Sequence, residues 1–366
     1  MLKSVRFKDY KSFTQETTID LIADSSEILK STNTYNNLLK GCCFFGSNSS
    51  GKSNALNAIT LLLHILFDKK INFENCVTFF DYKNKEQTMY FEYKFVIENK
   101  EITYYFMVNR KGELKKETLS IDDILIYSYE KEHILDPYSI LKNTKFKQGV
   151  YLKEIIKKKT NNKILDAWFK YLKNSFALDT TDSCSVNNLV KKDKSYLEKY
   201  LKKNGVNEMN DFLINHKFPF TLKYDNKEDV PLMMALKFVR ANKEIPLFLE
   251  SKGNMTLVSV LPMIFSVTKI GGIIALDEFC NGLHNKLEEL LIRYVFENSK
   301  NTQLFFVSHS TNLLKTSLLR PDQIYSVDFG EDGSILRKFS SENPRESQNL
   351  EKMYLAGVFG GIPLYE

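Results

Sequence analysis

The sequence predicts an α/β fold built on a parallel sheet, with an antiparallel β meander and a helical insertion. Residues 37–45 form an apolar run that leads through a glycine-rich loop into the helical pattern of residues 53–67. Residues 273–309 alternate strand, helix and strand, which is typical of a parallel sheet. Residues 88–129 read as strands separated by turn signals, which predicts the antiparallel meander.

The other segments complete the predicted order of elements. Alternating apolar and polar positions in residues 2–21 favour strands. Residues 131–215 are lysine-rich and contain apolar residues at helical spacing. We therefore predict two lobes and an insertion: an N-terminal lobe at 1–130, a helical lysine-rich insertion at 131–230, and a C-terminal lobe at 231–366.

Composition excludes several classes of protein. Of the 366 residues 43% are apolar and 26% are charged, which is ordinary for a globular chain and argues against a disordered or fibrous one. Five scattered cysteines show no CxxC pair and no Cys/His set at zinc spacing, so reduced thiols are expected.

One apolar stretch, residues 256–276, resembles a membrane span in length. It contains Pro262, Lys269 and the pair Gly271-Gly272, which fit a buried helix, a break and a buried strand better than a spanning helix. The N-terminus has no apolar segment of the signal-peptide type. We therefore expect a soluble, cytoplasmic protein with no membrane partner.

The sequence GSNSSGKS at 46–53 fits the phosphate-binding pattern G-x4-G-K-[ST]. Its glycines let backbone amides wrap a phosphate at the start of a helix. Lys52 would reach the β and γ phosphates, and Ser53 would ligate Mg²⁺. The predicted ATP contacts from this loop are Gly46, Ser47, Asn48, Ser49, Ser50, Gly51, Lys52, Ser53 and Asn54.

Two acids follow the apolar strand at 273–276. Asp277 would hold Mg²⁺, directly or through water, and Glu278 would act as general base for the attacking water. Without a phosphate-binding loop elsewhere, such acids would be read as a solvated strand end.

Ser308 and His309 end the next predicted strand. His309 can donate to a γ-phosphate and so report whether it is present; the alternative is a histidine of the surface or core. Ser308 has no acid at triad spacing and is not read as a nucleophile. The segment Glu250–Asn254 precedes a helix and is either an anion-binding turn or an N-cap.

Together these motifs resemble the ABC-type ATPases of the SMC- and RecF-like branch. ESKGN at 250–254 stands where that family has its LSGGQ-like signature, and DEFCNGLH at 277–284 is similar to its string DEPTNALD. The resemblance extends to the AbiL/RloA-like abortive-infection AAA family ATPases of bacteria. Its motifs stand here as VRFKDYKSF, FFGSNSSGKSN, ESKGN, DEFCNGLH, FFVSHSTNLL, LLRPDQIYSV and YLAGVFGGIP.

The resemblance implies that two copies sandwich ATP. Ser251, Lys252 and Gly253 of one copy would cap the γ-phosphate held by the other, and Lys11 could lie near the nucleotide. Residues 281–284 would communicate across the interface. Lys252 departs from the family pattern by replacing the first signature glycine, and His284 departs by replacing an aspartate.

The family also implies a role in phage defence beside a separate effector chain, either a TOPRIM or RloB-type nuclease or another toxin. This chain shows no acidic cluster of the TOPRIM kind and leaves no room for such a domain before Glu366. We therefore expect an ATP-gated regulator of a separate effector.

The distribution of charge along the chain is consistent with a second function, binding of nucleic acid. Residues 141–203 contain 16 lysines, no arginine and six acids, a net charge of +10 against +6 for the whole chain. This segment is either a solvated face or a contact surface for nucleic acid or an acidic partner. A repair or recombination ATPase that acts directly on nucleic acid is therefore the alternative. A scaffold with a structural ATP site is the third hypothesis, although Glu278 argues against it.

Overall fold

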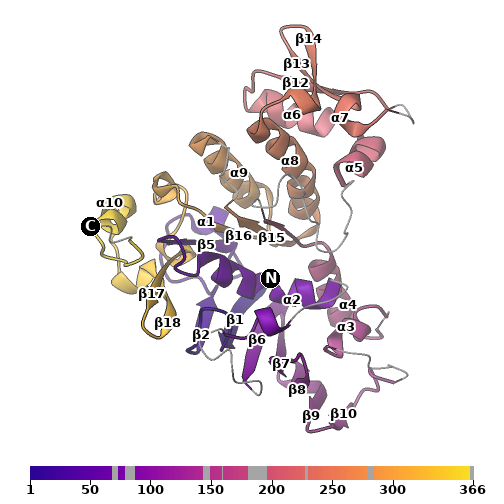
Figure 1. Cartoon of the computed structure of the whole chain (residues 1–366), viewed down its shortest axis with the longest axis vertical. Helices are drawn as coiled ribbons and strands as arrows, with labels where there is room; N and C mark the ends of the chain where they lie inside the picture. The colour runs from indigo at the N-terminus through magenta and orange to yellow at the C-terminus, as the bar shows by residue number, and fades with distance from the viewer. Residues whose placement is uncertain are drawn as a thin grey trace.

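The computed structural model describes residues 1–67, 73–78, 87–142, 149–158, 160–179, 196–226, 230–278 and 284–362. Within this part of the chain, two large sheets and the helices around them form the body of the molecule (Figure 1). This mixed α/β architecture confirms the predicted fold class.

The central six-stranded sheet has the order β11-β15-β16-β5-β17-β18. Its first five strands are parallel, and β18 pairs antiparallel with β17. Their bounds are Phe176–Asp179 (β11), Gly272–Asp277 (β15), Thr302–Val307 (β16), Gly41–Gly46 (β5), Ile324–Gly330 (β17) and Gly333–Lys338 (β18). All six residues of β5 and of β16 are buried, as expected for parallel strands covered on both faces.

Successive residues of these strands point into two different cores. On β5, Cys42 and Phe44 belong to the core that contains helix α2 (Lys52–Phe67), whereas Cys43 and Phe45 belong to the opposite one. The second core contains α8 (Lys252–Ile270) and α9 (Asn285–Asn298). The central sheet is therefore the middle layer of the molecule.

The other large sheet has seven antiparallel strands in the order β10-β9-β8-β7-β6-β1-β2. Its strands are Leu2–Lys8 (β1), Thr17–Asp20 (β2), Thr88–Ile97 (β6), Lys100–Asn109 (β7), Leu114–Ile121 (β8), Ile124–Glu130 (β9) and His133–Leu135 (β10). Burial alternates along β6, so one face packs on the α2 core. This is the meander predicted for residues 88–129.

Residues 150–179 are joined to this body, although the sequence analysis placed them in the insertion. Helix α4 (Lys163–Lys173) buries Trp168 completely, with its ring 5.4 Å from that of Phe95 and 6.3 Å from that of Tyr104. Strand β11 then pairs with β15. Such long-range packing has no local signature in the sequence.

A smaller unit, called the cap here, covers α8 and α9 at one end of the molecule (Figure 1). It contains both helices and strands, and one of these strands, residues 221–224, lies in the segment 131–230 where only helices were expected. Its elements are α5 (Tyr196–Asn204), α6 (Asn207–Asn215), β12 (Thr221–Tyr224), α7 (Leu232–Ala235), β13 (Leu236–Arg240), β14 (Lys243–Pro246) and the 3-10 turn η2 (Leu247–Leu249). Ala241 and Asn242 both have positive φ, which is the backbone of a tight hairpin turn between β13 and β14.

Short elements complete the described chain. They are α1 (Lys30–Asn33), β3 (Thr34–Tyr35), β4 (Leu38–Leu39), η1 (Phe73–Asn75), α3 (Leu152–Ile155), η3 (Thr311–Leu313), η4 (Pro321–Gln323), η5 (Phe339–Glu342) and α10 (Leu350–Leu355).

Among the described residues, α8 is the helix that is long and apolar enough to cross a membrane by length and composition. It carries Pro262 within its length and ends at Gly271, which has a φ of +92°. The strand β15 follows at once. Its buried residues belong to the second core, which matches the predicted sequence of buried helix, break and strand.

Candidate functional site

Three predicted motifs meet at the carboxyl edge of the central sheet. The loop 46–53 starts at the last residue of β5, Asp277 ends β15 and is followed by Glu278, and His309 comes two residues after β16. These three strands are neighbours and run parallel, so their carboxyl ends lie side by side. In open α/β sheets, ligands bind outside this edge.

The backbone of the loop needs glycine at both ends. A Cβ on Gly46 would lie 2.4 Å from the carbonyl oxygen of Val327, and Gly51 has a φ of +109°. A Cβ on Gly51 would also lie 2.2 Å from Oγ of Ser334. Helix α2 starts at Lys52, so its first amides belong to the loop. This is the order of strand, loop and helix that the phosphate-binding pattern predicts.

Lys52 lies over this loop. Its ammonium donates hydrogen bonds to the carbonyl oxygens of Gly46 at 3.1 Å and Ser47 at 2.6 Å. Burial lowers the pKa of Lys52, and the charges of Glu278 and Asp277 act in the opposite direction. The ammonium of Lys52 thus contacts the loop and is influenced by the charges of Asp277 and Glu278.

Ser53 connects the loop to the first of these acids. Its Oγ donates to Oδ1 of Asp277 at 3.1 Å. A hydroxyl and a carboxylate oxygen are hard ligands of the kind that Mg²⁺ prefers, so this pair fits the metal predicted from the sequence.

Glu278 and His309 face each other beside this pair. Oε1 of Glu278 lies 3.7 Å from Nε2 of His309, and both side chains are partly exposed. Glu278 has a φ of +45°, an uncommon conformation for a residue other than glycine. Burial and the charge of Lys52 lower the pKa of His309, while Glu278 raises it.

Lys11 comes to the same edge from the turn between β1 and β2. Burial lowers its pKa, and the charges of Cys76 and Asp277 act to raise it. The backbone amide of Lys11 donates to the carbonyl of Cys76 at 2.9 Å, and its ammonium lies 5.6 Å from the ring centre of Tyr10. The structure thus brings this predicted contact into electrostatic range of Asp277.

Ser12 and Ser334, which the sequence analysis did not single out, form hydrogen bonds with the loop 46–53 and with the first turn of α2. Ser334 donates through Oγ to the carbonyl of Ser50 at 2.6 Å and contacts Oγ of Ser12 at 2.7 Å. The side-chain amide of Asn54 donates to Oγ of Ser12 at 2.8 Å. Ser12 and Ser334 lie 322 positions apart, so no local pattern could have found this pair.

The signature segment lies elsewhere. Ser251 is the N-cap of α8, where its Oγ accepts from the amide of Asn254 at 3.3 Å. The guanidinium of Arg240 contacts both carboxylate oxygens of Glu250, at 2.9 and 3.0 Å. The side-chain amide of Asn254 donates a hydrogen bond to the same carboxylate. Lys252 and Gly253 form the first turn of α8. Figure 1 shows this end of α8 next to the cap, away from the central sheet.

The predicted interface segment is only partly described. Asn281, Gly282 and Leu283 lie outside the described residues. His284 is the N-cap of α9, and its Nδ1 accepts from the amide of Lys286 at 3.2 Å.

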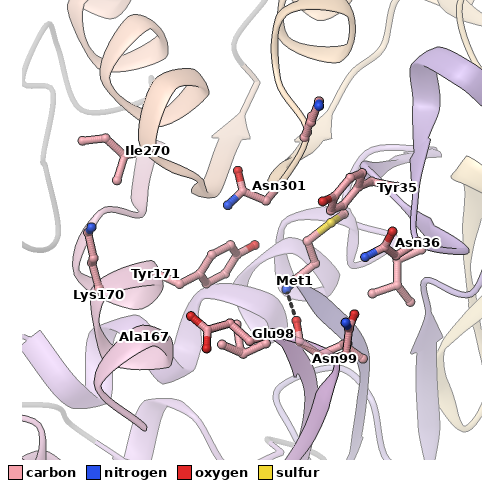
Figure 2. Close-up of a pocket in the computed structure, with 14 residues that line it drawn as sticks. Met1, Tyr35, Asn36, Glu98, Asn99, Ala167, Lys170, Tyr171, Ile270 and Asn301 are labelled. Atoms are coloured by element: carbon pink, nitrogen blue, oxygen red, sulfur yellow. Dashed lines mark hydrogen bonds between the residues drawn. The ribbon is translucent and has the colours of Figure 1, made fainter. Parts of the chain in front are cut away.

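A cavity of about 550 Å³ lies at the opposite edge of the sheet. Ile270 and Asn301, which line it, come just before β15 and β16, and Tyr35 and Tyr171 also face it (Figure 2). It is therefore separate from the edge that carries the phosphate-binding motif.

Comparison with known families agrees with this geometry. Residues 43–315 match the family "AAA domain, putative AbiEii toxin, Type IV TA system". The chain belongs to this family. This AbiEii-like AAA protein is therefore a P-loop ATPase of the ABC/SMC-like type, as the motifs in its sequence indicated. No curated protein matches it.

Solved structures similar to this AbiEii-like chain include three heads of SMC proteins. The "SMC head domain from Thermotoga maritima" has a TM-score of 0.51 and 19% identity, covering 92% of this chain and 98% of its own. An SmcHead bound to the C-winged helix domain of ScpA has a TM-score of 0.57 and 14% identity, with coverages of 93% and 99%.

The third, a head with an extended coiled coil bound to the C-terminal domain of ScpA derived from Pyrococcus furiosus, has a TM-score of 0.51 and 14% identity. It covers 97% of this chain and 98% of its own. At these identities the likeness shows the shared fold.

Proposed function

We propose that this chain binds ATP with Mg²⁺ and hydrolyses it, and that two copies pair around the nucleotide. The contact that supports this most directly is the hydrogen bond from Ser53 to Asp277, because it joins the end of the loop 46–53 to the end of β15. The partly exposed pair Glu278 and His309 lies next to it. A phosphate site, a metal-ligand pair and a base thus share one edge.

Each side chain has a distinct task in the proposed reaction. Lys52 and the amides of residues 46–53 bind the β and γ phosphates. Glu278 accepts a proton from the attacking water, and neutral His309 donates to an oxygen of the γ-phosphate. Mg²⁺, held by Ser53 and Asp277, would neutralise charge on the phosphate oxygens.

The proposed pairing of two copies accounts for the place of the signature segment. Ser251, Lys252 and Gly253 stand at the end of α8 beside the cap, whereas the phosphate-binding loop stands at the edge of the central sheet. A helix N-terminus binds anions through its exposed amides. A second copy would supply this turn to the γ-phosphate, so that ATP closes the dimer.

We further propose that this ATP-dependent dimer regulates a separate effector, a nuclease of the TOPRIM or RloB type or another toxin, in cytoplasmic anti-phage defence. The family match supports a place in a toxin–antitoxin setting. Two of the similar SMC heads are bound to domains of ScpA, which supports the idea that a head of this fold docks another chain.

Direct action on nucleic acid is the second candidate, favoured by the charge of +10 in residues 141–203. Residues 143–148, 159 and 180–195 of this segment lie outside the described part of the chain. Lys157, within it, pairs with Glu154 at 2.7 Å. This candidate requires DNA or RNA binding that weakens steeply with salt, and it fails if none is seen at low salt.

Replacement of Glu278 by Gln tests the main proposal. Without the base, hydrolysis should fall by about 10²–10⁴-fold while ATP stays bound, so a stable dimer should accumulate. Size-exclusion chromatography with light scattering, with and without ATP and Mg²⁺, measures this.

Lys52→Ala is the matched control, because it removes a phosphate contact and should stay monomeric with ATP. If Glu278→Gln binds ATP and elutes as it does without nucleotide, the sandwich is wrong. If wild type and Glu278→Gln hydrolyse ATP equally, Glu278 is not the base.

A further inference from the structure

A buried hydrogen bond lies directly behind His309. Ser308, the residue before it, is 1% exposed and donates through Oγ to Oε1 of Glu288 at 2.9 Å. The same Oγ accepts from the amide of Ser310 at 3.0 Å. The hydroxyl of Ser308 thus connects the backbone at Ser310, next to His309, with the carboxylate of Glu288 on α9.

Glu288 lies in the first turns of α9 and is also 1% exposed. Its amide donates to the carbonyl of His284, the N-cap of that helix, at 3.3 Å. A buried carboxylate costs free energy that an apolar side chain of similar size would not. Stability alone therefore does not explain a glutamate at position 288. A role in fixing the hydroxyl of Ser308 does explain it.

These contacts form a continuous path. It runs from the start of α9, which follows residues 279–283, through Glu288 and Ser308 to His309. His309 in turn faces Glu278 across 3.7 Å. A shift of the first turn of α9 would move the carboxylate of Glu288, which accepts the hydrogen bond from Ser308. The backbone of Ser308 and the adjacent imidazole of His309 would then move as well.

We propose that Glu288 and Ser308 are positioning residues, which hold His309 at the γ-phosphate and make its position depend on the N-terminal turn of α9. This inference rests on the proposed ATP hydrolysis.

The test compares three variants in the full-length protein. Glu288→Leu and Ser308→Ala each remove the bond and should lower kcat for ATP about tenfold, because small displacements of reacting groups cost large rate factors. Glu288→Gln keeps an acceptor oxygen at the same place and should stay within about threefold of wild type. The dissociation constant for ATP should change less than twofold in all three, because the bond that they alter involves neither Lys52 nor the amides of the loop 46–53.

Ser299→Ala is the matched control. Ser299 is another buried serine of this region, at the end of α9, and its Oγ donates to the carbonyl of Val295 at 2.7 Å. It should leave kcat unchanged. Glu288→Leu should keep or raise the melting temperature, since an apolar group replaces a buried carboxylate. Loss of rate without loss of stability separates positioning from a structural role.

The double variant Glu288→Leu/Ser308→Ala should be no slower than Ser308→Ala, because either substitution alone already breaks the bond between Ser308 and Glu288. Multiplied effects, or unchanged kcat in both single variants, would overturn the inference. If Ser308→Ala does not fold, the comparison of Glu288→Leu with Glu288→Gln still decides it. A wild-type protein that binds but does not hydrolyse ATP would instead contradict the proposed function.

Discussion

His309 is the side chain whose chemistry depends most directly on its immediate neighbours. Burial and the nearby ammonium of Lys52 both disfavour a charged imidazole, and the carboxylate of Glu278 at 3.7 Å only partly opposes them. The pKa of His309 is therefore lowered from its ordinary value of 6.5. At neutral pH the ring is uncharged, with one nitrogen able to donate and one able to accept.

The pKa of His309 provides a prediction at this scale. NMR titration of the nucleotide-free protein should place it below 6.5, so the ring gains its proton only as pH falls through that lower value. Lys52→Ala removes a cation that lowers the pKa and should raise it. Glu278→Gln removes an anion that raises the pKa and should lower it further.

Ser299→Ala, at the end of α9, serves as the control and should leave the pKa of His309 unchanged. A lower pKa in Lys52→Ala together with a higher one in Glu278→Gln, or no response to either substitution, would show that these charges do not act on His309.

The phosphate-binding loop owes its shape to elements on either side of it. Helix α2 supplies the amides, while Ser12 from the turn after β1 and Ser334 from β18 pack against Gly51. The loop is thus a junction of three segments, and a side chain at Gly51 would disturb all of them.

Gly51→Ala is the prediction for this element. It must adopt a φ of +109° and bring its Cβ to 2.2 Å from Oγ of Ser334. Strain of this kind costs about 1–3 kcal/mol, so the free energy of unfolding in urea should fall by that amount and ATP affinity should fall with it. Gly205→Ala is the matched control, because Gly205 has a φ of +68° but open space where its Cβ would lie.

Gly205→Ala should be destabilised less than Gly51→Ala and bind ATP normally. Equal ATP affinity in Gly51→Ala and wild type would contradict the assignment of this loop.

At the scale of the whole molecule, two buried polar side chains join distant segments. Gln303 on β16 donates to the carbonyls of Leu2 and Leu39 and accepts from the amide of Leu2 and the hydroxyl of Tyr171. It therefore ties β1 and α4 to the central sheet. Arg320, which is fully buried, joins the loop before α1 to the turn η4 through its hydrogen bonds to the carbonyl of Ser26 and the carboxylate of Asp322.

Arg320→Met tests how much this second junction contributes. Arg320 forms two hydrogen bonds of 2.9 Å with Asp322, which is itself buried, and one of 2.8 Å with Asp24. Removing one partner of a buried ion pair costs about 3–5 kcal/mol, because the other charge stays behind. Urea unfolding should show this loss.

The double variant Arg320→Met/Asp322→Asn should recover part of the stability, since it removes the stranded charge. If Arg320→Met unfolds at the same urea concentration as wild type, the junction is not a source of stability.

The sequence by itself determined the α/β class, the strand, loop and helix around Lys52, and the acids and histidine after the next strands. These follow from local patterns, because an apolar strand and the residue types at its end are read within ten positions. Membership of the ABC-type branch followed from the order of those motifs.

Only the tertiary structure decided which distant residues meet. Ser12 and Ser334 brace the loop across 322 positions, Ser308 reaches Glu288 on another element, and Trp168 brings residues 150–179 into the core. One strand of the cap, β12, likewise lies in the segment 131–230, where helices alone had been expected. Contacts of this range arise from burial and packing between elements, which local periodicity does not record.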